Sequence, residues 1–253
     1  MNTGPTAPRP RPRPALAPAG SARGRRRRGL LVSFDGPGCA GKTTLAARVA
    51  QRLARDNIPH LLTREPSDGP LGSLARTGTH HFHGHTLACL VAADRYHHLD
   101  QQIRPALAAD AVVLCDRYVL SSHAFQVLDG VDPAFVQALN AHADAPGLAV
   151  VLTCEPAELA RRLTARGSHG RFEDDPDFPA REHARYRDLN PALIGDATET
   201  LHLDSTRTDT ESLANTVVTA VHALRSVPGT AKQTTAGDHD RPVHSDDRRP
   251  RDP

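Results

Sequence analysis

The chain has 253 residues, a formal net charge of +2, and an aromatic fraction of only 4% with no Trp. This length accommodates one large α/β domain or two small ones, with a mainly aliphatic core. Residues 1–28 contain eight Arg and no acidic residue, so acidic side chains outnumber basic ones by six in the remainder. The basic character therefore belongs to the N-terminal segment, and it gives no reason to expect nucleic-acid binding by a folded domain.

Cysteine spacing and hydropathy both favour a cytoplasmic protein. The four cysteines form no CxxC pair, which indicates reduced thiols rather than a disulfide framework. No apolar run approaches the ~20 residues of a membrane-spanning helix. The apolar stretch after Arg26–Arg28 ends at Asp35, which is too short for the ~7–15 apolar residues of an export signal.

Composition divides the chain into one folded region and two tails. Residues 1–28 alternate Pro with Arg, Ala and Gly, and residues 227–253 are rich in Asp, Arg, Pro and His, so we predict that both are disordered. For the N-terminal tail, an arm that binds an anionic partner is an alternative to a simple solvated extension. Residues 29–226 are predicted to form one domain.

Within this domain, short aliphatic runs alternate with longer helical patterns. Buried strands are predicted over residues 29–35, 58–63, 111–115, 148–154 and 200–203. Helices are predicted between them: from the first loop to about residue 55, over about 85–107, from Asp132-Pro133, and from Glu155-Pro156 to Gly167. The alternation predicts a three-layer α/β fold with a five-stranded parallel sheet and helices on both faces.

A phosphate-binding loop follows the first predicted strand and precedes a helix. Its residues fit the pattern G-x-x-x-x-G-K-[ST], and with Thr44 they form the predicted ATP-binding set: Gly36, Pro37, Gly38, Cys39, Ala40, Gly41, Lys42 and Thr43. Glycines let successive backbone N–H groups face one anion, and the helix N-terminus adds its dipole. Lys42 is predicted to contact the β- and γ-phosphates, and the Thr43 hydroxyl is the expected Mg²⁺ ligand. The motif predicts a P-loop enzyme that uses Mg-ATP.

Four further motifs follow in order along the chain. They are Thr63-Arg64-Glu65-Pro66, Ala92-Ala93-Asp94-Arg95, Asp116-Arg117-Tyr118 with Ser121-Ser122-x-Ala124-Phe125-Gln126, and Arg171-Phe172-Glu173 with Phe178 and Tyr186 beyond. Together they resemble the thymidylate kinase family of nucleoside-monophosphate kinases, from about Leu30 to Tyr186. The resemblance implies ATP-dependent phosphorylation of dTMP to dTDP and, in common with other members, a homodimer.

The resemblance also implies roles for individual residues. Arg117 and Arg76 would hold the phosphate of the acceptor, Arg95, Ser122 and Gln126 would face its base, and Glu65 would lie near its sugar or phosphate. The position of Arg64 at a strand end adds it to the acceptor-binding set, because ligands of parallel sheets bind at this edge. Asp116 ends a predicted strand, where a carboxylate can hold Mg²⁺ through water; a structural ion pair with a neighbouring Arg is the alternative.

Residues 161–175 resemble the lid of the family. Arg161, Arg162 and Arg166 lie on a predicted helix, and Arg171 lies in the glycine-rich loop after it. With Gly167 and Gly170 as hinges, this segment could close over ATP and exclude water. Arg166 or Arg171 is then the predicted catalytic arginine, beside Lys42, Asp116 and Arg117; the alternative for the helical arginines is a merely basic face.

Three departures from the family pattern leave the acceptor open. Gly38 occupies a position where the family usually has an acidic residue. Cys39 stands where the family usually has Gly, and Asp35 stands where it usually has Glu. Val91 replaces the aromatic residue expected to stack on thymine, which would lower affinity ~10–100-fold unless Tyr96 or Phe82 substitutes, since stacking contributes ~1–3 kcal/mol. Gly170 stands where an Asp often precedes the lid Arg. A kinase for a different nucleotide or nucleoside, or a non-catalytic nucleotide-binding relative, is therefore the alternative function.

A cluster of histidines (His80, His81, His83, His85) superficially suggests a metal site. Spacings of one and two residues fit neither a helix-face pair nor the zinc frameworks. We predict instead a loop beside the acceptor pocket.

Overall fold

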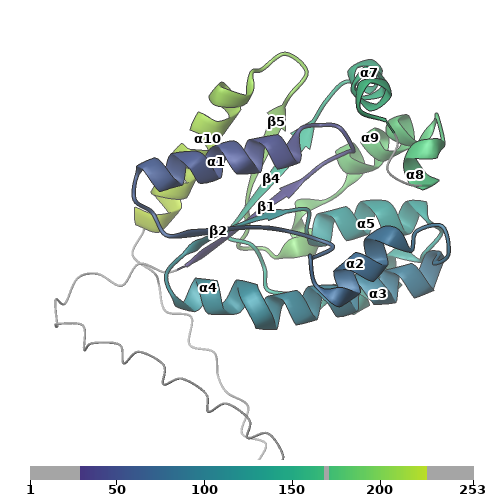
Figure 1. Ribbon diagram of the computed structural model, residues 1–253, viewed down its shortest axis with the longest axis horizontal. Coiled ribbons are helices and arrows are strands. Elements are labelled where there is room, and N and C mark those ends of the chain that lie inside the picture. The colour runs from purple at the N-terminus through teal and green to yellow at the C-terminus, as the bar shows by residue number, and fades with distance from the viewer. Residues whose placement is uncertain (1–28, 168–170, 227–253) are drawn as a thin grey trace, which may run out of the picture.

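A computed structural model of the chain describes residues 29–167 and 171–226. The two predicted tails and the departure at Gly170 lie outside these residues. The described part forms a five-stranded parallel sheet with helices on both faces, as predicted (Figure 1). The strands are β1 (Leu30–Asp35), β2 (His60–Arg64), β3 (Val112–Asp116), β4 (Leu148–Thr153) and β5 (Glu199–Asp204). Each begins and ends within two residues of its predicted range.

The order of the strands places β1 at the centre of the sheet. The sequence of neighbours is β2-β3-β1-β4-β5, and Asp116 at the end of β3 lies in register with Phe34 of β1 and Arg64 of β2. Because all strands run in the same direction, their carboxyl ends and the loops after them share one edge. The P-loop after β1 and the Asp116-Arg117 pair after β3 are therefore neighbours, although they are far apart in the sequence.

One face of the sheet is covered by α1 (Lys42–Arg55) and α10 (Thr210–Ser226), which lie side by side (Figure 1). Their inward residues pack on Val32, Phe34 and Val150 in one aliphatic cluster. Helix α1 ends where predicted. Its buried positions recur every three to four residues, which is the amphipathic pattern of a surface helix.

The other face is covered by a long helical run and by two helices that border the site. The predicted helix over 85–107 is observed as α3 (Gly84–His98), a π-helical turn η1 (Leu99–Ile103) and α4 (Arg104–Ala108). Beside it pack α5 (Val119–Leu128) and α9 (Phe178–Asp188). Helix α5 was not individually predicted, because seven of its ten residues are buried and it has no apolar stripe.

The remaining helical elements are short. They are α2 (Pro70–Thr77), α6 (Pro133–Asn140), α7 (Pro156–Arg166), α8 (Arg171–Asp174) and the 3₁₀ turn η2 (Pro191–Ile194). The predicted starts at Asp132-Pro133 and Glu155-Pro156 and the stop at Gly167 are confirmed. The Asp132 carboxylate caps α6 by accepting from the N–H groups of Ala134 and Phe135.

Close packing of α2 on the preceding loop gives a first prediction. Gly72 is buried, and a Cβ at this position would lie 2.1 Å from the backbone O and 2.4 Å from the N of Ser67. Gly72→Ala must therefore displace backbone and should lower the free energy of unfolding by roughly 1–3 kcal/mol. Chemical denaturation measures the change. Ser73→Ala, at an exposed position of the same helix, should differ by less than about 0.5 kcal/mol; equal stability of Gly72→Ala and wild type would contradict this packing.

Candidate active site

The P-loop joins β1 to α1 with the backbone shape that the motif predicts. Gly36, Cys39 and Gly41 have φ values of 140°, 61° and 96°. A Cβ on Gly36 would lie 2.2 Å from the Leu152 carbonyl O, so no larger residue fits there. Residues 42–44 form the first turn of α1, so that their N–H groups, which have no partner within the helix, point toward the loop.

Lys42 is buried in this loop. Its Nζ donates to the carbonyl O atoms of Gly36 and Pro37 at 2.8 and 2.6 Å. Burial, and next the positive charge of Arg117, lower the pKa of Lys42 to about 8. A cation held without a full carboxylate partner has a strong electrostatic preference for an incoming anion.

Thr43 and Asp116, the two residues predicted to hold Mg²⁺, are in contact. The Thr43 hydroxyl donates to Asp116 Oδ2, and Oδ1 of the same carboxylate is buried with no hydrogen-bond partner among the described residues. A hydroxyl and a half-satisfied carboxylate beside a phosphate cradle are a donor set that suits Mg²⁺. No ion pair between Asp116 and an Arg is seen in residues 29–167 and 171–226, which removes support for the alternative of a structural salt bridge.

Arg117 lines the cavity in which the predicted acceptor-binding residues meet. Its backbone has φ 70°, and its N–H donates to Phe34 O at 2.8 Å. The guanidinium lies over the Phe125 ring, 4.7 Å from its centroid. Its NH1 atom is buried without a hydrogen-bond partner in the described chain, and lies 3.9 Å from Glu182 Oε1. The guanidinium therefore keeps donors for an anion.

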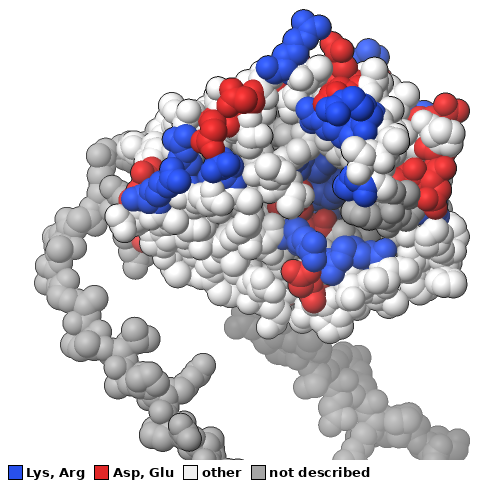
Figure 2. Space-filling view, turned by 45° about the horizontal axis from the view of Figure 1, so that its top comes forward, with Lys and Arg blue, Asp and Glu red and all other residues white. Residues whose placement is uncertain are grey.

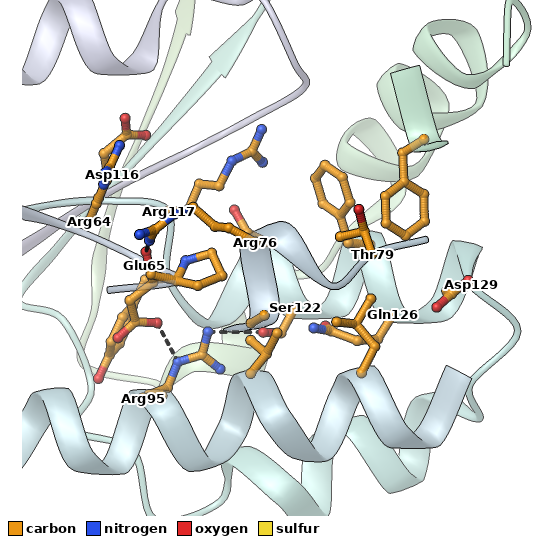
Figure 3. Close-up of a pocket in the computed structure, with 18 of the residues that line it drawn as sticks. Arg64, Glu65, Arg76, Thr79, Arg95, Asp116, Arg117, Ser122, Gln126 and Asp129 are labelled. Carbon is orange, nitrogen blue, oxygen red and sulfur yellow. Dashed lines mark hydrogen bonds and ion pairs between the residues drawn. The ribbon is translucent and has the colours of Figure 1, made fainter. Parts of the chain in front are cut away.

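The acceptor cavity has a volume of about 360 Å³, a size that suits a small ligand. The cationic end carries Arg64, Arg76 and Arg117, and the polar end carries Ser122, Gln126 and Asp129 (Figure 3). In the space-filling view, Lys and Arg side chains gather around a hollow in which acidic side chains are also visible (Figure 2). The residues that line the cavity include Thr43, Arg64, Glu65, Arg76, Thr79, Val91, Arg95, Asp116, Arg117, Tyr118, Ser122, Phe125, Gln126, Asp129, Arg166, Phe172 and Glu173.

At the polar end, Arg95 is a fully buried anchor. Its Nε donates to Glu65 Oε2 at 2.7 Å and its NH2 to Ser122 Oγ at 2.9 Å, while NH1 donates to Asn140 (Figure 3). Gln126 is also buried, and its Oε1 atom has no hydrogen-bond partner among the residues described. Arg95, Ser122 and Gln126, predicted to face a base, are thus brought together with unused hydrogen-bonding capacity.

Arg64 and Arg76 line the cationic end but are already paired. Both contact Asp68, and Arg76 NH1 also donates to the carbonyl O atoms of Pro66 and Ser67. Arg76 therefore holds the loop after β2 in shape as well as lining the cavity. Glu65 is not free either, because Arg95 and His98 Nδ1 surround its carboxylate.

The predicted lid arginines separate into different environments. Arg166 pairs with Glu173 at the entrance of the cavity, next to the P-loop. Arg171 instead donates to Thr79 O and to Asp129 Oδ1 at the base end of the cavity. Of the two residues predicted as the catalytic lid arginine, the geometry favours Arg166.

The other two arginines of α7 do not face the acceptor cavity. Arg161 pairs with Glu158 on the surface, while Arg162 NH2 donates to Ser205 O at 2.8 Å and its NH1 to Cys39 O at 3.4 Å. Arg161 fits the alternative of a solvated basic face. Arg162 ties α7 to the P-loop.

Neither Tyr96 nor Phe82 replaces the ring expected at Val91. The Tyr96 hydroxyl donates to Leu139 O, and neither ring lines the cavity. The rings that line the cavity are Tyr118, Phe125 and Phe172. The centroids of Phe125 and Phe172 lie 5.5 Å apart in an edge-to-face arrangement. Phe172 belongs to α8, within the predicted lid, so this segment supplies part of the cavity wall.

A second cavity, of about 630 Å³, lies on the other side of the P-loop. Thr44, Leu152, Arg162 and the segment 205–210 after β5 line it. Ser205 Oγ donates to Ala40 O at 2.8 Å and so couples this segment to the loop. Residues 205–210 were not predicted to belong to the site, because they carry no motif and lie far from the P-loop in the sequence.

Comparison with known proteins decides the family. Residues 34–207 match the family described as thymidylate kinase. The chain belongs to the thymidylate kinase family. A protein from Pyrobaculum calidifontis named "probable thymidylate kinase" is 37% identical over 150 residues, 57% of this chain and 75% of the relative. A thymidylate kinase from Cutibacterium acnes is 36% identical over 164 residues, 61% of this chain and 80% of the relative. Membership confirms the resemblance and supports ATP-dependent phosphorylation of a nucleoside monophosphate.

The remaining sequence predictions concern the cysteines, the histidine cluster and membrane-spanning helices. All four cysteines are free, as expected. His80, His81, His83 and His85 are exposed around the turn between α2 and α3, and in residues 29–167 and 171–226 they form no group that could hold a metal. No helix of the described chain is long and apolar enough to cross a membrane.

The environment of Lys42 gives a second prediction. The chain has only two lysines, Lys42 and Lys232, so a protein labelled with ¹³C-lysine gives two side-chain NMR signals. The Lys42 signal should titrate with a midpoint of about 8, and Mg-ATP should raise this midpoint because phosphate favours the charged amine. Lys42→Arg assigns the signal. Two midpoints near the ordinary value, or no shift with ATP, would contradict the buried environment.

Proposed function

We propose that this protein transfers the γ-phosphoryl group of ATP to dTMP, forming ADP and dTDP. The observation that carries the proposal is that two cavities meet the P-loop: Thr43 and Arg117 line one of them, and Cys39, Gly41 and Thr44 line the other. A donor nucleotide in one cavity and an acceptor in the other would place their phosphates around Lys42 and Arg117. Family membership supports thymidylate as the acceptor.

On the donor side, residues 36–44 would bind the ATP phosphates through backbone N–H groups, and Lys42 would turn from Gly36 and Pro37 toward them. Thr43 and Asp116 would hold Mg²⁺, which when bound screens the charge of the phosphates and orients them. Arg162 and residues 205–210 border the cavity beyond the loop, where the nucleoside part of ATP would lie.

On the acceptor side, Arg117 would hold the monophosphate, with Arg64 and Arg76 at the same end of the cavity. Arg95, Ser122 and Gln126 would form hydrogen bonds with the edge of the base. Phe125 and Phe172 would pack against the base. Glu65 would act through Arg95. Its Oε2 atom accepts a hydrogen bond from Arg95 Nε at 2.7 Å and so orients the guanidinium.

The transfer itself needs little covalent chemistry from the protein. An acceptor phosphate oxygen, already anionic, attacks the γ-phosphorus in line, and the bond to the β-phosphate oxygen breaks. Lys42, Arg117 and Arg166 would compensate the charge that gathers on the transferred group, while closure of the lid excludes water. The site would therefore catalyse the reaction by positioning the two substrates and by compensating the negative charge of the transferred group.

We also propose the wider context of this activity. The kinase unit would be residues 29–226, with a lid over about 161–175, and residues 1–28 and 227–253 would be disordered tails. The protein would act in the cytoplasm as a homodimer, without binding nucleic acid through its folded domain. Removal of residues 1–28 tests this boundary. If these residues are a disordered tail, kcat and KM of the shortened protein should be nearly unchanged.

The function is tested by ADP release from ATP with separate acceptors. We expect turnover with dTMP to exceed that with dUMP, dCMP, dGMP, dAMP, UMP and thymidine. Lys42→Ala should lower kcat by at least about 100-fold, because it removes a charge from the transition state, and the fold should persist by circular dichroism. Preference for another acceptor would make this a repurposed relative. No turnover with any acceptor, combined with saturable ATP binding, would favour a non-catalytic protein.

The ring supplied by the lid gives a separate prediction. Phe172→Ala should raise KM for dTMP about 10-fold, since a ring–base contact contributes ~1–3 kcal/mol, with KM for ATP little changed. Phe135→Ala is the matched control, because Phe135 is an exposed ring that contacts His85 outside the cavity. Equal KM values for dTMP in the two variants would exclude Phe172 as a wall of the base site.

A further inference from the structure

Glu182 is a buried charge on a helix face that otherwise carries aromatic side chains. The buried residues of α9 are Phe178, Glu182 and Tyr186, which recur every four residues along one face. The Glu182 side chain is only 3% exposed. Burying a carboxylate without full compensation is costly, so a group of this kind calls for a partner or a task.

The partners of Glu182 are parts of the phosphoryl-transfer site. Oε2 accepts from the backbone N–H of Gly38 in the P-loop at 2.7 Å, and Oε1 lies 3.9 Å from NH1 of Arg117. Neither Oε1 nor NH1 has a hydrogen-bond partner within the described residues. Burial raises the pKa of Glu182, while the charges of Arg117 and Lys42 act against this rise. One carboxylate thus connects the donor loop with the cation on the acceptor side.

The P-loop leaves room for this carboxylate at Gly38. A Cβ at Gly38 would lie 3.5 Å from Glu182 Oε2 and also 3.5 Å from Glu173 Oε1, which are ordinary contact distances. Gly38 is not among the residues with positive φ, so its backbone does not require glycine. The position lacks an acidic side chain of its own, and carboxylates from α9 and α8 approach it from outside the loop.

We propose that Glu182 is a positioning residue for phosphoryl transfer: its carboxylate fixes the P-loop at Gly38 and aims the guanidinium of Arg117 between donor and acceptor phosphates. Phe125 confines one face of that guanidinium, and Glu182 attracts one end of it. The substrates then meet a cation whose orientation has been set in advance, which is the condition for electrostatic catalysis. This inference rests on the proposed function, because it assigns a role within that site.

The packing of α9 opposes the other reading, in which Glu182 merely occupies the place of a phosphate and leaves when ATP binds. Glu182 lies between Phe178 and Tyr186, which are 4% and 2% exposed. The Tyr186 hydroxyl donates to Ser121 Oγ at 2.9 Å and anchors the helix to α5. The carboxylate could reach solvent only if this anchored helix moved, so we infer that it stays in place.

The first test compares Glu182→Gln with wild type in steady-state kinetics. Gln retains an oxygen for the Gly38 N–H but removes the charge opposite Arg117. We expect kcat with dTMP to fall about 10-fold or more, with KM for ATP changed less than about 3-fold, as when an interaction specific to the transition state is lost. Asp188→Asn is the matched control, since Asp188 is an exposed carboxylate at the end of the same helix; its kcat should equal that of wild type.

The second test moves the charge onto the loop. Gly38→Asp alone should lower kcat, because it places another carboxylate beside Glu182 and Glu173. In the double variant Gly38→Asp with Glu182→Gln, the new carboxylate stands where the old one was lost, and kcat should exceed that of both single variants. A role of Glu182 in folding alone would not produce this recovery, because a carboxylate on the P-loop cannot restore contacts within α9.

Several outcomes would overturn the proposal. Unchanged kcat in Glu182→Gln, or tighter ATP binding and faster turnover, would show that the carboxylate only competes with phosphate. A double variant whose kcat does not exceed that of the faster single variant would exclude charge placement as the cause. If circular dichroism shows that Glu182→Gln does not fold, Gly38→Asp becomes the deciding variant, because it leaves α9 unchanged. A kcat of Gly38→Asp equal to or above that of wild type would then contradict the proposal.

The controls also separate this inference from the proposed function. Wild-type turnover with dTMP is measured first. If dTMP is inactive but another acceptor is phosphorylated, the proposed acceptor is wrong, and the variants are compared with the active acceptor. Absence of turnover with every acceptor overturns both.

Discussion

One buried carboxylate, that of Asp35, fixes the relation between the sheet and the acceptor site. Asp35 ends β1 and is fully buried. Its Oδ1 atom accepts from the N–H groups of Tyr118 and Ser121 at 2.9 and 3.0 Å and from Ser121 Oγ at 2.7 Å. It thus caps the N-terminus of α5, where backbone donors lack partners and an anion is favoured. The P-loop begins at the next residue, so one side chain joins both halves of the site.

This connection extends to the lid side of the molecule. Ser121 Oγ also accepts from the hydroxyl of Tyr186 on α9, which carries Glu182 four residues earlier. Strand β1, helix α5 and helix α9 are therefore linked by one chain of hydrogen bonds, and such linked networks rigidify a site. Arg117, whose N–H is held by Phe34 O, lies inside this frame. The frame explains how a loop residue with φ 70° keeps a defined direction.

Charge is arranged by the same logic throughout the site. Glu65 orients Arg95, Glu173 pairs with Arg166, and Glu182 faces Arg117. Each of these cations has a carboxylate behind it, which limits its conformations before substrate arrives. Such preorganised cations do not need to reorganise as negative charge develops.

The sequence predicted the sheet, the P-loop and the family because their signals are local. Short aliphatic runs predict buried strands, and the spacing from Gly36 to Thr43 is itself the phosphate-binding device. Family motifs predicted that Arg95, Ser122 and Gln126 share one pocket. All three line the same cavity, and Arg95 donates to Ser122. Helix α5 was harder to predict, because burial on several sides leaves no amphipathic stripe.

The partners of the arginines could not be predicted, because they depend on how distant elements pack. Arg171 was grouped with Arg166 by position, yet it reaches Asp129 on the acceptor side. The ring at the base end comes from Phe172 of the lid, whereas Tyr96 and Phe82 were the candidates nearer in sequence. A signal for Glu182 was present: an acidic residue four positions from both Phe178 and Tyr186 on a helix predicts a buried charge.

Under the proposed function, the two cavities beside the P-loop bind donor and acceptor at the same time. Calorimetric titration with adenosine and thymidine joined through five phosphates tests this requirement, because a single molecule can then fill both cavities. We expect one molecule bound per chain, tighter than either ATP or dTMP, and displaced by each of them. Binding that only ATP displaces, or binding no tighter than that of ATP, would contradict it.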